Sequence, residues 1–197
     1  PIFVAEVSSN HSQDLNRAKE FIKVSSQIGC QAVKFQLFKI DKLFAPEILA
    51  KSKTHRDIKE WELPIEFIPE LSTYSHSLGL QFSCTPFYLE AIKELEPYVD
   101  FYKIASYELL WDDLIIECAK TKKDLVLSTG MATLDEINHA VEVFKTHSNS
   151  KLTLLHAISG YPTPLKEANL KAIETLRNKF KIDVGLSDHS VSKDVIT

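Results

Sequence analysis

Short apolar runs alternate with amphipathic stretches along this chain. The apolar runs have strand length and are rich in β-branched and aromatic residues. The stretches between them repeat apolar residues at helical spacing, as Leu134, Ile137, Val141 and Phe144 do. The pattern predicts strands at residues 2–7, 32–38, 80–86, 101–106, 124–130, 151–159 and 183–189, with helices between them.

Seven β-α units in one direction leave two architectures open, a doubly wound open sheet and a closed TIM (β/α)8 barrel. No G-x-G-x-x-G motif follows the first strand, which argues against a dinucleotide-binding sheet. The short, evenly spaced strands favour the barrel. Because a barrel closes only with its eighth strand, we expect an α/β fold of the TIM-barrel type that is truncated after strand seven. Residues 1–197 would then form one incomplete domain.

Composition narrows the class of protein. A formal net charge of -4 argues against a nucleic-acid or anionic-membrane partner, so any anion site must be local. No apolar run approaches the roughly 20 residues of a membrane span. The three cysteines, Cys30, Cys84 and Cys118, lie far apart and form no C-x-x-C motif. We therefore expect reduced cysteines in the core of a cytoplasmic protein.

One connection is unusually long. Residues 39–63 are charged and poorly periodic, and they follow the second strand. In a barrel they would lie on the face where active sites form. Long loops of this kind are lids, binding loops or disordered insertions, and the sequence leaves these alternatives open.

Lys103 stands in the otherwise apolar strand FYKIAS, where an unpaired ammonium would cost on the order of several kcal/mol. Other polar residues also gather near the carboxyl ends of the strands, which meet at one mouth in a barrel. Two lysines with several hydroxyls predict a site for a phosphate or carboxylate dianion. The polar residues are Glu6, Ser8, Asn10, His11, Lys34, Gln36, Ser83, Thr85, Lys103, Ser106, Ser128, Thr129, His156, Ser159, Tyr161, Ser187, Asp188 and His189.

Structural roles for these residues stay open. Lys103 could form an ion pair with Glu6 instead of facing a ligand. His156 could be a hydrogen-bonded core histidine. His189 could belong to a helix N-terminus, and serines at strand ends are often turn or cap residues.

Seven motifs stand out along the chain: FVAEVSSNH, AVKFQ, FSCTPF, YKIAS, LVLSTGMAT, LLHAISGYPTP and VGLSDHS. In order and spacing they resemble the sialic acid synthase family, which includes N-acetylneuraminate, legionaminate and pseudaminate synthases. The resemblance covers nearly the whole chain. It implies a TIM-barrel transferase of polysaccharide biosynthesis that condenses phosphoenolpyruvate with an open-chain N-acylated amino sugar of the N-acetylmannosamine type and releases phosphate.

The resemblance also implies roles for individual residues. Glu6 would lie beside the reacting carbons, and His189 would be one of two histidine ligands of a divalent metal, Mn or Mg. Gln36, Ser159 and Tyr161 would contact the sugar. Catalysis would rest on Glu6, Lys34, Lys103 and His189. The residues that would hold phosphoenolpyruvate are Lys34, Thr85, Lys103, Ser106, Ser128 and Ser187.

Other features of the family are expected outside this chain. The second metal histidine would lie on strand eight, and an antifreeze-like C-terminal domain would follow in a homodimer. The 197 residues alone are therefore expected to be inactive. The family usually has a glycine where Ser8 stands and another shortly after the Asn-His pair.

Two rival functions remain at this point. One is a Schiff-base aldolase that uses Lys103 as its nucleophile. The other is a non-catalytic barrel that binds phosphate and sugar.

Overall fold

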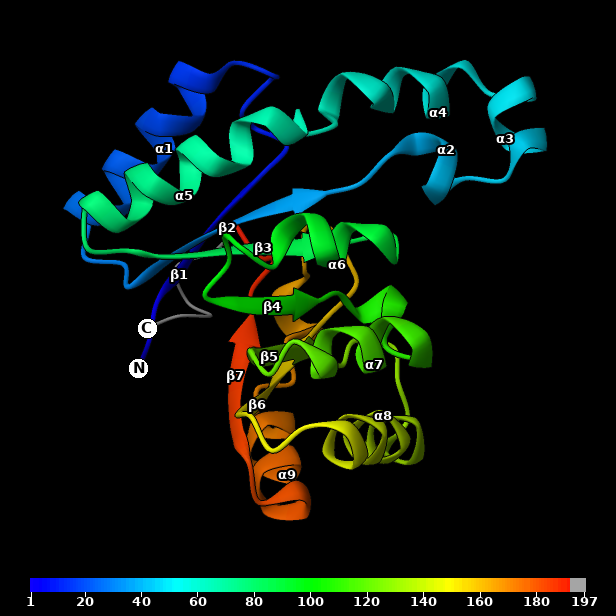
Figure 1. Ribbon diagram of the computed structural model, residues 1–197. Helices are drawn as coiled ribbons and strands as arrows, with labels where there is room; N and C mark the ends of the chain where they lie inside the picture. The colour runs from blue at the N-terminus through cyan, green and yellow to red at the C-terminus, as the bar shows by residue number, and fades with distance from the viewer. Residues whose placement is uncertain (192–197) are drawn as a thin grey trace. The chain divides into compact units, whose positions relative to one another are not determined.

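The computed structural model describes residues 1–191, and the chain divides into two compact units, Pro1–Tyr102 and Lys103–Thr197. Each unit alternates parallel strands with helices (Figure 1). Strand β4 (Phe101–Ile104) begins in the first unit and ends in the second.

The first unit orders its strands β1, β2, β3 and β4, each parallel to the next. Helices α1 and α5 lie side by side against these strands (Figure 1). The elements before β4 are β1 (Val4–Ser8), α1 (Leu15–Gln27), β2 (Ala32–Leu37), α2 (Ile40–Leu43), α3 (Pro46–Lys51), α4 (Lys53–Asp57), the 3-10 turns η1 (Ile58–Trp61) and η2 (Ile65–Phe67), α5 (Ile68–Ser77), β3 (Gln81–Pro86) and α6 (Glu90–Leu95).

Helix α1 shows why these residues fold as they do. The Asp14 carboxylate accepts hydrogen bonds from the Asn16 and Arg17 amides and so caps the first turn. Ala18 and Ile22 lie one turn apart and are fully buried. The helix ends before Gly29, whose φ of +85° is a left-handed conformation that suits glycine. Gly29 thus follows the C-cap residue Ile28 and ends the helix.

The long connection after β2 is helical. It contains α2, α3, α4 and η1, which run along the cyan segment of Figure 1. The longest of these has six residues. Helices this short make less than two turns, so they leave no readable 3.6-residue period, and the sequence pattern missed them.

In the second unit the strands β5, β6 and β7 pair in parallel and in chain order. Helix α8 begins with a capping box, in which Thr133 and Glu136 bond each other's backbone amides. The elements after β4 are η3 (Ser106–Glu108), α7 (Asp112–Lys120), β5 (Asp124–Ser128), α8 (Leu134–His147), β6 (Leu152–Ala157), η4 (Leu165–Glu167), α9 (Lys171–Phe180) and β7 (Asp183–Ser187).

The α/β class and the seven predicted strands are confirmed within residues 1–191, with strand ends shifted by at most two residues. Closure into an eight-stranded barrel stays a prediction. Cys84 and Cys118 are buried as expected, but Cys30 is half-buried because it lies in the link between α1 and β2. Across the described residues, each helix is too short or too polar to cross a bilayer.

Candidate functional site

A cluster of charged and hydroxyl side chains lies on the strands of the first unit. Lys34, in β2, is 7% exposed, and its ammonium forms an ion pair with Glu6 of β1. The ammonium also donates to the Thr85 hydroxyl of β3, at 3.4 Å. The register explains this grouping, because Lys34 lies beside Glu6 on one side and Ser83 on the other. We call Glu6, Lys34 and Thr85 the Lys34 cluster.

A backbone irregularity fixes the Glu6 carboxylate. The pairing of β1 with β2 shifts by one residue between Glu6 and Ser8. Ser8 has a φ of +52°, in the left-handed region. In this conformation its amide donates to Oε1 of Glu6 at 3.0 Å, while Oε2 contacts Lys34. Bulges of this kind often re-aim a side chain beside an active site.

Replacing Ser8 by glycine is expected to raise the free energy of unfolding by roughly 0.5–1 kcal/mol. The left-handed conformation costs a non-glycine residue about 1–2 kcal/mol, which the larger backbone entropy of glycine partly offsets. Urea unfolding of the Ser8→Gly variant measures the change. Ser9→Gly is the matched control, since Ser9 has no positive φ, and it should lower stability. A destabilised Ser8→Gly variant would contradict this account.

Gln36 follows Lys34 on the same face of β2 and lies beside Thr85 in the register. It lines a pocket of about 880 Å³ within the first unit, together with Ser8. The predicted sugar-contacting residue therefore opens onto a space large enough for a small ligand.

The second unit holds the other buried lysine. Lys103 is 9% exposed, and burial lowers its pKa to about 8, although the negative charge of Glu108 partly opposes this. Burial raises the pKa of Glu108 to about 7, against the charge of Lys103. The Oε2 atom of Glu108 is buried and has no hydrogen-bond partner among residues 1–191. Within the second unit, Glu108 therefore supplies the negative charge that acts on Lys103.

Sequence reasoning missed Glu108 and considered Glu6 as the partner of Lys103. Glu6 instead pairs with Lys34. The available signal was an acidic residue inside the apolar stretch SYELL, five positions after Lys103.

Serine hydroxyls gather around Gly130, which follows β5. The Gly130 amide donates to the Ser106 hydroxyl at 3.0 Å. A Cβ atom on Gly130 would lie 2.8 Å from the Ser159 hydroxyl and 2.9 Å from that of Ser106. The Ser128 hydroxyl is buried and lacks a hydrogen-bond partner in the described part of the chain. A buried hydroxyl without a protein partner can be satisfied by an ordered water or by a polar ligand.

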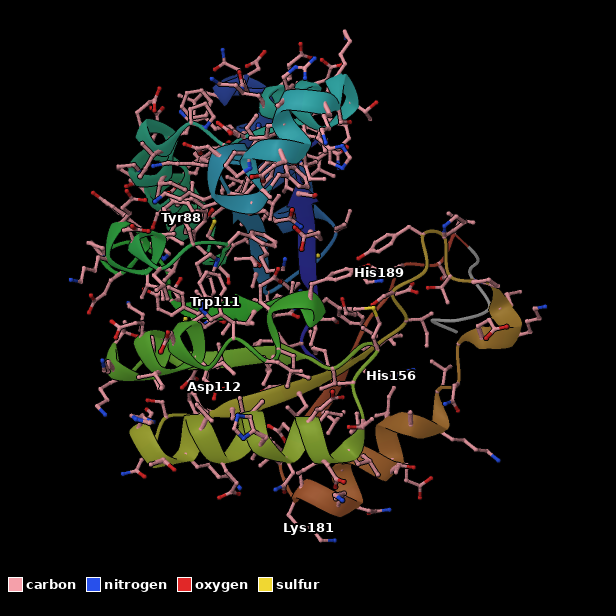
Figure 2. All side chains as sticks on the ribbon, turned by 90° about the vertical axis from the view of Figure 1, so that its right-hand side faces the viewer. Tyr88, Trp111, Asp112, His156, Lys181 and His189 are labelled. Atoms are coloured by element: carbon pink, nitrogen blue, oxygen red, sulfur yellow. The ribbon has the colours of Figure 1, made fainter. Side chains whose placement is uncertain are left out.

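His189 follows β7 and is labelled in Figure 2. Its Nδ1 lies 2.8 Å from the carbonyl oxygen of Ile158, so Nδ1 carries the proton and donates. Nε2 is then an acceptor, 3.1 Å from the Tyr161 hydroxyl and 3.4 Å from that of Ser187. The Tyr161 ring stacks on the imidazole with centroids 4.2 Å apart. We call Tyr161, Ser187 and His189 the His189 cluster.

This tautomer fits a metal ligand. Metal-binding histidines commonly donate their other ring N–H to a carbonyl or carboxylate, which leaves a lone pair for the metal. Residues 1–191 contain no group of three or more His, Cys, Asp or Glu side chains that could hold a metal ion. The described residues therefore provide one suitable ligand and not a complete site.

His156, also labelled in Figure 2, has the structural role left open above. It is buried, and its Nε2 lies 2.8 Å from the carbonyl oxygen of Ala168. This bond supports the structural role, because it engages Nε2 with the protein's own backbone.

The described residues thus form an α/β protein of parallel β-α units whose strands and strand ends carry two buried lysines, a buried serine hydroxyl and a histidine with an acceptor nitrogen. The chain belongs to the NeuB family, whose model matches residues 21–197. This membership and the names of its relatives confirm the resemblance to the sialic acid synthases.

Two curated relatives and one crystal structure illustrate the likeness. The chain is 35% identical to an N,N'-diacetyllegionaminic acid synthase of Campylobacter jejuni, covering 96% of this chain and 60% of that protein. It is 34% identical to a pseudaminic acid synthase of Helicobacter pylori, covering 97% and 59%. The crystal structure of an N-acetylneuraminic acid synthetase from Leptospira borgpetersenii matches with a TM-score of 0.89 at 33% identity, covering 96% of this chain and 66% of that one. The chain thus spans about 60% of the length of these curated relatives.

Proposed function

We propose that the protein carrying this chain condenses phosphoenolpyruvate with an open-chain N-acylated amino sugar and releases phosphate. Its family membership and the synthase names of its relatives support this reaction. The observation that carries it is the pair of buried lysines, Lys34 and Lys103, each in a unit that also holds strand-end hydroxyls. Buried ammonium groups with spare hydroxyl donors suit a multiply charged anion.

Lys34, Thr85, Lys103, Ser106, Ser128 and Ser187 would bind the phosphate and carboxylate of phosphoenolpyruvate. Charge-assisted hydrogen bonds from such donors are stronger than neutral ones. Gln36, Ser159 and Tyr161 would orient the sugar. Holding both substrates in position lets the enol carbon of phosphoenolpyruvate attack the sugar aldehyde without an additional entropic penalty.

Positive charge develops on the phosphate-bearing carbon after this attack. Glu6, held by the Ser8 amide and by Lys34, would stabilise that charge before water adds and phosphate leaves. Glu108, with a pKa of about 7, is suited to take a proton from the water. His189 would be one ligand of a divalent cation, Mn or Mg, which would polarise the aldehyde.

The affinity for phosphoenolpyruvate is expected to weaken as the pH rises from about 7 to about 9.5, a range in which a phosphate group stays fully ionised. Above the Lys103 pKa of about 8, the ammonium loses its proton and its attraction for the anion. The dissociation constant should then rise by up to about tenfold per pH unit. Calorimetric titration across this range measures it.

Two variants test the origin of this pH dependence. Lys103→Arg keeps its charge throughout the range, so its affinity should stay nearly constant above pH 8. Glu108→Gln should remove any change in affinity near pH 7 that comes from ionisation of the Glu108 carboxyl. A wild-type affinity that is flat between pH 7 and 9.5 would argue against contact between Lys103 and the anion.

Gly130→Ala is expected to lower the affinity for phosphoenolpyruvate by about tenfold or more. The new Cβ would displace the Ser106 and Ser159 hydroxyls and would also lie 3.0 Å from the Ala157 carbonyl oxygen. Calorimetric titration measures the loss. Gly160→Ala, whose Cβ has only ordinary contacts of 3.8 Å or more, is the matched control. Equal affinities for the two variants would contradict the role of the hydroxyls.

Phosphate release from phosphoenolpyruvate is the direct test of the function. The assay adds Mn and a panel of N-acylated amino sugars and omits each component in turn. Release that needs both the metal and one sugar would establish the synthase. Saturable binding of phosphoenolpyruvate without phosphate release, whichever sugar is added, would indicate a non-catalytic binding protein.

A Schiff-base aldolase is the second candidate, because the lowered pKa of Lys103 is typical of lysine nucleophiles. Borohydride reduction with a carbonyl substrate would trap an imine on Lys103 in an aldolase and nothing in the synthase. Homodimer formation and a cytoplasmic location stay predictions, and light scattering of the purified protein would measure the first.

A further inference from the structure

Met131 is the one methionine of the 197 residues, and it directly follows Gly130, around which serine hydroxyls gather. Both residues belong to the turn after β5, in which the Ala132 amide donates to the Thr129 carbonyl oxygen at 3.4 Å. Gly130 and Met131 are the two central residues of this turn. The amide of the first donates to the Ser106 hydroxyl at 3.0 Å, so Met131 is one residue away from a group of the candidate anion site.

The Met131 backbone has a left-handed conformation, with a φ of +66°. The second central residue of a turn with positive φ is usually glycine or asparagine, because a Cβ atom is disfavoured there. Met131 is 63% exposed, so burial of its side chain offsets little of this cost. A strained and exposed residue next to a candidate site points to a functional role.

Met131 is also the most exposed of the residues that carry sulfur, which are three cysteines and this methionine. Cys84 and Cys118 are buried, and burial raises the pKa of both thiols, which disfavours the reactive thiolate. Cys30 is half-buried and lies in the first unit. Oxidation of a thioether needs access and no ionisation, so an oxidant in solution would reach Met131 before the two buried thiols.

On the basis of the function proposed above, we propose that Met131 is an oxidation site whose sulfoxide form weakens the binding of phosphoenolpyruvate at the Ser106 hydroxyl. The oxidant is a peroxide. The sulfur lone pair forms the S–O bond as the O–O bond of hydrogen peroxide breaks, and the second oxygen leaves as water. The sulfur loses two electrons and the peroxide gains them, which gives methionine sulfoxide.

The new oxygen changes the chemistry beside the anion site. A thioether is nearly apolar, whereas a sulfoxide oxygen carries partial negative charge and accepts hydrogen bonds. It would compete for the Ser106 proton, and its partial charge would repel a bound anion. The reduced side chain does neither, so oxidation of Met131 separates a binding form of the site from a weakened one.

The test measures the affinity of the full-length protein for phosphoenolpyruvate by calorimetry, without added metal, before and after treatment with hydrogen peroxide. Dithiothreitol then reverses disulfides and sulfenic acids, and peptide mass spectrometry should locate one added oxygen atom on Met131. The affinity should fall about three- to tenfold, as expected for the loss of one hydrogen bond to a bound anion. Methionine sulfoxide reductases A and B should restore it.

Three variants separate this modification from a general effect of peroxide. Met131→Leu keeps an apolar side chain of similar volume, so it should bind as the untreated wild type and resist peroxide. Met131→Gln carries a polar oxygen without treatment, so it should bind like the oxidised protein. Met131→Leu/Leu170→Met is the matched control, because Leu170 is 39% exposed in the same unit, and oxidation there should leave the affinity unchanged.

The outcomes distinguish this inference from the proposed function. Unchanged affinity after oxidation of Met131, in a protein that releases phosphate, would overturn the inference and leave the synthase function intact. Equal losses on peroxide treatment in the wild type and in Met131→Leu would also overturn it. A loss of affinity on oxidation, with no phosphate release from the untreated protein, would refute the synthase and retain the oxidation site.

Discussion

Lys103→Ala is expected to abolish measurable binding of phosphoenolpyruvate, with a loss of about 100-fold or more. Lys103 is nine-tenths buried, and its ammonium would face both the ligand anion and the Glu108 carboxylate. Removing one partner of a buried charged pair costs about 2–5 kcal/mol, or roughly 30- to several-thousand-fold in affinity. Calorimetric titration with phosphoenolpyruvate measures the loss.

Two controls separate the loss of a ligand contact from a general defect. Lys166→Ala removes an exposed lysine of the same unit and should bind as the wild type. Lys103→Ala leaves Glu108 as a buried carboxylate without its cation, so a Lys103→Ala/Glu108→Gln variant should recover stability but not affinity. Unchanged affinity in a folded Lys103→Ala variant would mean that Lys103 serves only as the structural partner of Glu108.

His189→Ala is expected to leave the binding of phosphoenolpyruvate within about twofold of the wild type and to remove metal-dependent phosphate release. Polarisation of a carbonyl by a bound cation is worth several kcal/mol, so the rate should fall on the order of 100- to 1000-fold. The Nδ1 bond to Ile158 fixes the tautomer that a metal ligand needs. Phosphate release at increasing Mn concentration measures the effect.

His139→Ala is the matched control, because His139 is exposed on α8 and pairs with Asp112. It should keep both binding and metal dependence. A normal metal-dependent rate in His189→Ala would remove His189 from the metal site. A loss of phosphoenolpyruvate binding in this variant would instead assign the residue to the anion.

Most of the fold could be predicted from hydrophobic periodicity. All the strands predicted within residues 1–191 are present, because buried parallel strands need continuous apolar runs and these are visible in one sequence. The capping box at Thr133 and the left-handed Gly29 were also readable, since both depend on local backbone chemistry. The helices of residues 40–57 were not, because each is too short to show a period.

The sequence predicted which residues belong to the candidate site, but it did not predict which of their side chains pair with one another. The sequence indicated that Lys34 and Lys103 are buried charges in need of partners, and both are buried. It did not indicate that Glu6 pairs with Lys34 or that Glu108 lies near Lys103. Ion pairs form between side chains that are close in space, and closeness across strands depends on register and turn geometry.

By itself, the sequence determined the order of β and α elements, the reduced cysteines and the residue types available for an anion, since each follows from local periodicity or composition. Only the tertiary structure decided which polar side chains have hydrogen-bond partners within the protein. His156 is a core residue that hydrogen-bonds the carbonyl oxygen of Ala168. His189 is a candidate metal ligand because it hydrogen-bonds the carbonyl oxygen of Ile158. Each of these bonds joins residues that are separate in the chain, 12 positions apart for His156 and 31 for His189, and such bonds form only when packing brings the partners together.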